Sequence, residues 1–84
     1  MSPVVFRHRG FKFHFYANGG NPREPMHVHV LKDNIDAKFW LWPEVRMAYN
    51  DGFDARTERL LMELILTQRP LIGRVWNDFF SDSG

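Results

Sequence analysis

Two histidines alternate with two valines in the segment from residue 23 to 30, which reads Arg-Glu-Pro-Met-His-Val-His-Val. Successive side chains of a β-strand point to opposite faces, so His27 and His29 are expected to share one face and the valines the other. Histidine titrates near neutral pH, which suits proton transfer, metal ligation and pH sensing. The pattern therefore predicts a functional site centred on these two imidazoles without selecting its chemistry.

Two hairpins are expected to position the histidines. Residues 4–8 and 11–16 read as strands joined at Arg9-Gly10, where glycine can adopt the positive φ of a tight turn. Residues 27–32 and 35–42 read as a second pair joined at Asp33-Asn34. Two-residue turns pair Val4 with Phe15, Phe6 with Phe13, His8 with Phe11, His27 with Trp40, Val28 with Phe39, His29 with Lys38 and Val30 with Ala37.

These pairings separate the side chains into two faces, because directly opposed residues lie on the same side of a sheet. The apolar face contains Phe6, Phe11, Phe13, Phe15, Val28, Val30, Ala37, Phe39 and Leu41. The histidine face contains Arg7, Lys12, His14, Tyr16, His27, His29, Lys38, Trp40 and Trp42.

The rest of the chain predicts one further strand and two helices. Within residues 44–49, Val45, Met47 and Tyr49 alternate as in a strand, although Pro43-Glu44 can also open a short helix; we favour the strand. Asp54 is a good N-cap for a helix over residues 55–68. Pro70 suits the first position of a second helix that carries an apolar stripe to Phe80.

The expected fold is therefore α+β, with residues 1–84 as a single domain. An antiparallel meander of three or four strands has two C-terminal helices packed on its phenylalanine face. The eight phenylalanines and three tryptophans must supply the stability, because the chain has no cysteine and therefore no disulfide, catalytic thiolate or cysteine-ligated metal.

Charge and hydropathy indicate the kind of ligand and the cellular location to expect for the protein. The formal net charge is only +1, but the first half of the chain holds most of the Lys and Arg residues and is the half expected to meet an anion. Neither a signal peptide nor a membrane-spanning segment is expected. We expect a cytoplasmic location with no membrane contact.

Five motifs follow one another along the chain, namely Gly10–Tyr16, Glu24–Val30, Ala37–Leu41, Tyr49–Phe53 and Trp76–Phe80. Together, and in this order, they resemble the motifs of the bacterial domain of unknown function 4160 family. The resemblance implies a small protein without an established activity, encoded beside another small protein in a toxin–antitoxin-like pair. Members of this family more often have proline where Met26 stands, and a shorter loop before the histidine motif.

The main functional hypothesis is binding through the histidine face. Tyr16, Trp40 and Trp42 can stack on the bases of RNA or single-stranded nucleic acid, and Arg7, Lys12 and Lys38 can neutralise phosphates, with His14 beside them. The same aromatic face can instead bind a partner protein encoded nearby, or a second copy of the chain in a homodimer.

Two chemical alternatives remain open, beside a purely structural role for the histidines. A metal-independent ribonuclease needs a base, an acid and a positive group, which His27, His29, His14 and Lys38 can supply. A zinc site can use His27 and His29 as ligands, completed by His14 or Glu24. In the main hypothesis no cofactor is required.

Overall fold

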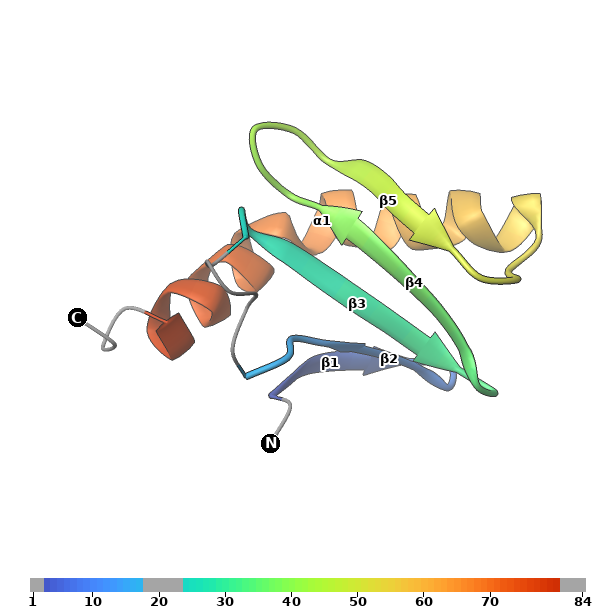
Figure 1. The fold of residues 1–84 in the computed structure, drawn as a ribbon, viewed down its shortest axis with the longest axis horizontal. Helices are drawn as coiled ribbons and strands as arrows, with labels where there is room; N and C mark the ends of the chain where they lie inside the picture. Colours follow the sequence, from blue (N-terminus) through green and yellow to red (C-terminus); the bar gives the residue numbers. More distant parts are fainter. Residues whose placement is uncertain (1–2, 18–23, 81–84) are drawn as a thin grey trace.

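The computed structural model describes residues 3–17 and 24–80 of the chain. Within these residues the chain forms five strands and one helix, in the order β1 (Val4–His8), β2 (Phe11–His14), β3 (His27–Lys32), β4 (Ile35–Trp40), β5 (Arg46–Asn50) and α1 (Ala55–Phe80). The strands form one antiparallel sheet in sequence order (Figure 1). The α+β meander is confirmed, whereas the expected count of three or four strands was too low.

Both hairpins have the predicted two-residue turns. The central residues have positive φ in each, 48° and 88° at Arg9 and Gly10, and 51° and 66° at Asp33 and Asn34. Two positive φ values in succession are typical of the turn whose twist matches that of antiparallel strands. All four predicted pairings between β3 and β4 are consequently present.

The first hairpin departs from the prediction at its open end. Phe6 pairs with Phe13 and His8 with Phe11 as expected, but an irregularity between Val4 and Phe6 shifts the register. Val4 therefore lies opposite His14, and the predicted pairing of Val4 with Phe15 is wrong. The predicted pairing requires uninterrupted alternation along β1. An extra residue in β1 between Val4 and Phe6 interrupts it.

The segment after β4 is a strand, so the alternative of a short helix at residues 44–49 is wrong. Strand β5 forms the edge of the sheet beside β4, and Asn50 closes the turn that follows it by accepting hydrogen bonds from the backbone N–H groups of Gly52 and Phe53. Asp54 then caps α1 as predicted, since its Oδ1 accepts the N–H of Thr57 at 2.8 Å.

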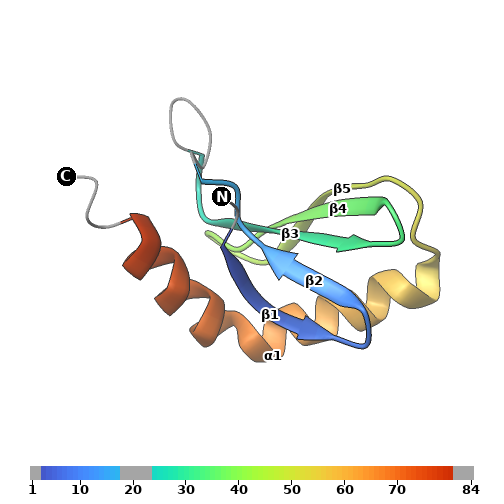
Figure 2. The same cartoon turned by 90° about the horizontal axis from the view of Figure 1, so that it is seen from below.

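A single helix, α1, replaces the two predicted helices. Pro70 lies inside it, and Figure 2 shows the helix bending midway along its length. Proline costs about 3 kcal/mol within a helix because it lacks an N–H and its ring crowds the preceding turn. Burial of Ile72, Trp76 and Phe80 beyond the bend offsets this cost, at about 1.5–3 kcal/mol for a large apolar side chain. In the described residues no helix is long and apolar enough to cross a membrane.

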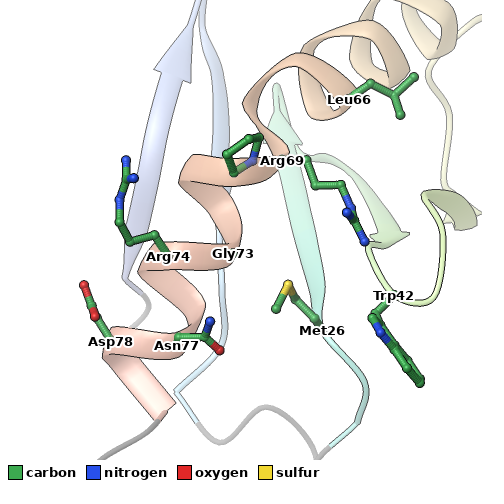
Figure 3. A pocket seen from close by; sticks show the side chains of 9 residues that line it. Met26, Trp42, Leu66, Arg69, Gly73, Arg74, Asn77 and Asp78 are labelled. Atoms are coloured by element: carbon green, nitrogen blue, oxygen red, sulfur yellow. The ribbon is translucent and has the colours of Figure 1, made fainter.

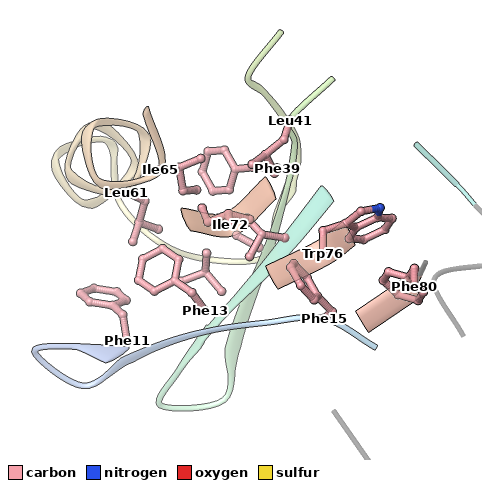
Figure 4. Packing of buried hydrophobic residues seen from close by; sticks show 13 residues of the cluster. Phe11, Phe13, Phe15, Phe39, Leu41, Leu61, Ile65, Ile72, Trp76 and Phe80 are labelled. Atoms are coloured by element: carbon pink, nitrogen blue, oxygen red, sulfur yellow. The ribbon is translucent and has the colours of Figure 1, made fainter. Parts of the chain in front are cut away.

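The core lies between α1 and one face of the sheet (Figures 2 and 4). Phenylalanines and valines of the sheet meet the buried stripe of the helix, as the sequence pattern predicts. The fully buried large side chains are Phe13, Phe15, Val28, Val30, Phe39, Leu41, Leu61, Ile65 and Ile72.

The first turn provides a test of this fold with two substitutions of opposite sign. Gly10→Ala is expected to lower the free energy of unfolding by about 1–2 kcal/mol, because an L residue is strained at positive φ. Its Cβ would also lie 3.3 Å from Cε of Lys32. Arg9→Asn is expected to raise stability by a few tenths of a kcal/mol, since asparagine tolerates this conformation better. Urea unfolding of both variants checks the turn, and an unchanged midpoint for Gly10→Ala would contradict it.

Candidate functional site

The sheet brings His14, His27 and His29 together on the face opposite α1. His14 on β2 lies directly opposite His29 on β3, and the ring centroids are 5.6 Å apart. His27 and His29 are two residues apart on β3, with centroids 5.2 Å apart. The predicted grouping of the three histidines on one face is therefore present. We refer to them as the histidine row.

The histidine row is buried, although no helix of the described residues covers this face. The exposed fractions are 3% for His14, 3% for His27 and 6% for His29. Aromatic rings from neighbouring strands pack around these side chains, and their centroids lie 4.4 Å (Tyr16 to His29) and 5.7 Å (Trp40 to His27) away. The imidazoles thus form a second, smaller packed layer rather than an open chemical surface.

Trp76 closes one end of the row from the far part of α1. Its ring centroid is 5.1 Å from that of His27 and 5.1 Å from that of Phe15. The sequence indicated Trp76 only as part of the apolar stripe of a second helix. Its contact with His27 depends on the bent path of α1 past the end of the sheet, which no local pattern reveals.

Burial keeps the row uncharged at neutral pH. Loss of hydration lowers the pKa of His14, with nearby Lys12 adding to the effect, and in the same way lowers the pKa of His27. Burial, together with neighbouring His27, lowers the pKa of His29 to about 4. Neutral imidazoles do not attract phosphate as cations, so the predicted binding role of His14 is not electrostatic.

Hydrogen bonds hold part of the row in place. Nδ1 of His27 donates to the carbonyl of Pro25 at 2.8 Å, which leaves Nε2 as the unprotonated nitrogen of the neutral ring. Neither ring nitrogen of His14 makes a hydrogen bond of good geometry among the described residues, although an interaction with the Phe15 backbone opposes the fall in its pKa.

A tyrosine and an aspartate that the sequence did not single out adjoin His29. The Tyr49 hydroxyl donates to Oδ2 of Asp36 at 2.5 Å and lies 3.5 Å from Nδ1 of His29. Burial and the bond to Asp36 raise the pKa of Tyr49, so its hydroxyl stays protonated. Tyr49 on β5 pairs with Lys38 on β4, and this register brings the tyrosine hydroxyl to the histidine row. The alternation within residues 45–49 is the sequence signal that could have placed Tyr49 on this face.

Lys38 is not the free phosphate-binding cation that was expected. Its ammonium forms an ion pair with Glu24 and lies 4.2 Å from the centroid of the Trp40 ring. The hydrogen bond from Lys38 lowers the pKa of Glu24 in turn. Glu24 therefore neutralises Lys38, and Trp40 is half-buried between His27 and this pair.

Arg7, Lys12 and Tyr16 remain available on the same face. Arg7 and Lys12 are directly opposed on β1 and β2. The Tyr16 side chain is 45% exposed just beyond the end of β2. We refer to these three residues as the basic rim.

Trp42 does not belong to this face, although the sequence pattern placed it there. Strand β4 ends at Trp40, so alternation no longer governs the next residues. The Trp42 side chain instead lines a hollow beside Leu66 and Arg69 of α1 (Figure 3).

The geometry gives the zinc alternative no support. Among residues 3–17 and 24–80, no three His, Asp or Glu side chains are arranged so that they could hold a metal ion. The rings of His27 and His29 meet edge to face, at an interplanar angle of 83°, and those of His14 and His29 are tilted by 32°.

The fold and site define a small α+β protein in which a five-stranded meander buries phenylalanines against one helix and histidines on its other face. The model of the domain of unknown function family DUF4160 matches residues 10–77, and the chain belongs to this family. No curated protein and no solved structure matches the chain.

The buried row predicts that the protein loses stability in mild acid. Unfolding restores the ordinary histidine pKa of 6.5, so the unfolded chain binds more protons than the folded chain between pH 6.5 and about 4. The free energy of unfolding should therefore fall as pH falls through this window. His29 alone should contribute about 2 kcal/mol between pH 7 and pH 5.

Urea unfolding at closely spaced pH values measures this slope. The variant His29→Gln removes the titrating group, and the fall in stability between pH 7 and pH 5 should shrink by the His29 share even if its stability at pH 7 is lower. Equal stability of the natural protein at pH 7 and pH 5 would show that the histidines are not held neutral by burial.

Proposed function

We propose that this protein binds single-stranded RNA on the open face of its sheet, as one component of a toxin–antitoxin-like pair. The observation that supports RNA binding is the basic rim, where two opposed cations and an exposed aromatic ring lie on one face of the sheet. The proposed toxin–antitoxin-like pairing rests on the family resemblance. The proposed cytoplasmic location rests on the composition of the chain.

The two cations of the rim lie directly opposite each other on β1 and β2. Like charges directly opposite each other on neighbouring strands are destabilising. Within the described part of the chain neither Arg7 nor Lys12 forms an ion pair with an acid, in contrast to Lys38. A phosphate between them would relieve the repulsion and release its own counterions.

Tyr16 supplies a stacking surface on the same face, further along the chain from Lys12. Its ring packs edge-on against His29, at 4.4 Å, and against His14, at 5.2 Å. These buried rings support Tyr16 from below while much of its side chain stays exposed. Stacking of a base on an exposed aromatic ring contributes about 1–3 kcal/mol and does not require a particular base. The histidine row would thus serve binding by positioning Tyr16.

A labelled single-stranded oligouridylate tests the proposal by fluorescence anisotropy. Arg7→Gln and Lys12→Gln should each weaken binding and reduce the slope of log affinity against log salt concentration by roughly one phosphate contact, about 0.7. Tyr16→Ala should weaken binding by about 1–3 kcal/mol with little change in that slope.

The matched control is Arg56→Gln, which removes one positive charge from an exposed site near the start of α1. This variant should bind as the natural protein does. Equal weakening by Arg56→Gln and Arg7→Gln would indicate attraction by net charge alone. A natural protein that does not bind the oligonucleotide at low salt would rule out the proposal and leave protein partners for this face.

Cleavage of the bound RNA is a second candidate function, which one observation favours. The bond from Nδ1 of His27 to the Pro25 carbonyl leaves Nε2 unprotonated, the state that a general base requires. His29 lies beside it, with Tyr49 and Asp36 as neighbours. Cleavage also needs a general acid, and this role is harder to assign. His29 is neutral at pH 7, and Lys38 forms an ion pair with Glu24.

Incubation of the protein with end-labelled RNA in the presence of a chelator tests this candidate. At RNA concentrations that saturate binding, His27→Gln and His29→Gln should each reduce cleavage by about 10²-fold or more if they are base and acid. Circular dichroism melting must show that both variants remain folded, since both side chains are buried. RNA that is bound but never cut by the natural protein would exclude ribonuclease activity.

A further inference from the structure

A hollow of about 790 Å³ lies beside the second half of α1, away from the histidine row (Figure 3). One side is the surface of α1 around Pro70 and Gly73. The other side is formed by Met26, just before β3, and Trp42, just after β4. This volume suits a small ligand or a few side chains of a peptide rather than a folded domain.

The hollow gathers the most exposed apolar side chains of the described chain. Trp42 is 62% exposed and Leu66 is 54% exposed, and no other large hydrophobic side chain in residues 3–17 and 24–80 reaches either value. Both line the hollow together with Met26. Single exposed apolar residues are ordinary, but their convergence on one concave site favours a binding role.

Arg69 provides a fixed positive group at this site. Its Nε and Nη2 donate to the carbonyl oxygen of Leu41 at 3.1 Å and 2.6 Å, which ties the guanidinium to the end of the sheet. Figure 3 shows the side chain reaching from α1 toward the segment that carries Trp42. The remaining N–H donors of the guanidinium are available, since Arg69 makes no ion pair with a described acid.

A second cation lies further along the helix. Arg74 is exposed, lines the hollow and likewise has no acidic partner within 4.0 Å among the described residues. Asp78 is the one acid among the lining residues. The site therefore combines an aromatic and aliphatic surface with an excess of positive charge.

We propose that this hollow binds an acidic peptide segment of a partner protein, with an apolar side chain between Trp42 and Leu66 and carboxylates on Arg69 and Arg74. Arginine and tryptophan dominate the binding energy of protein interfaces, and the planar guanidinium matches a carboxylate. The aliphatic surface of Leu66 and Met26 suits an amino-acid side chain better than a base. Asp78 would repel a continuous polyanion, whereas a peptide can place its acids away from it.

This site uses no residue of the basic rim, so it can fail or succeed independently of RNA binding. A toxin–antitoxin-like pair needs a surface for its protein partner, and the hollow supplies one on a different part of the molecule. An occupied hollow would leave the open face of the sheet accessible.

A synthetic peptide in which Asp and Glu alternate with Leu and Phe is the probe, used with the full chain labelled with ¹⁵N. Titration should shift the Trp42 indole N–H and the backbone amides of Arg69 and Gly73, while Lys12 and Tyr16 stay unchanged. The same peptide with Lys in place of each acid should cause no shift at these positions.

Affinity measured by anisotropy of the labelled peptide locates the contacts. Trp42→Ala should weaken binding by about tenfold or more, as expected of an interface anchor. Arg74→Gln should weaken it by about threefold to tenfold, and Arg56→Gln, an exposed site outside the hollow, should have no effect. Trp42 and Arg74 are exposed and lie outside the hydrophobic core, so both variants are expected to fold.

Four results would overturn the proposal. The first three are the absence of shifts at millimolar peptide, shifts confined to the open face of the sheet, and equal weakening by Arg56→Gln. Oligouridylate that shifts Trp42 and Arg69 and displaces the peptide would also overturn it, because the hollow would then be a nucleic-acid site.

Discussion

Burial of β3 on both faces is the constraint on which the rest of the structure depends. Val28 and Val30 are buried against α1, and His27 and His29 are buried on the opposite side. The helix accounts for the first burial. The second requires a cover of side chains from neighbouring segments of the sheet and from the far part of α1. Tyr16, Trp40, Trp76 and Tyr49 provide these contacts.

This arrangement separates the residues that support the site from those that can meet a ligand. The three histidines are neutral and packed, and Lys38 is neutralised by Glu24. What remains exposed lies at the borders of the histidine layer. The most distinctive residues of the sequence are therefore buried in this protein, and the surface groups beside them, which are less distinctive in sequence, are better placed to contact a partner.

The sequence predicted the local parts of this fold well, because turn chemistry and alternation determine them. Both two-residue turns, the pairing of β3 with β4 and the phenylalanine face were predicted from such signals. The prediction that one helix ends before Pro70 and another begins there was wrong. The local preference of proline for a helix start is outweighed by a tertiary effect, the burial of Ile72, Trp76 and Phe80. The burial of the histidines, the ion pair of Lys38 and the position of Trp42 depend on contacts between segments far apart in sequence, which no periodicity encodes.

The order of strands in the sheet bears on how the protein folds. Every strand pairs with its neighbour in sequence, so the sheet can form one pair of strands at a time, and the longest connection to close is the one between β2 and β3. The helix that covers the phenylalanines follows all five strands in the chain. During synthesis on the ribosome, an apolar sheet face is therefore complete before its cover has been made. The nascent chain must pass through a stage in which it is open to aggregation or to capture by a chaperone.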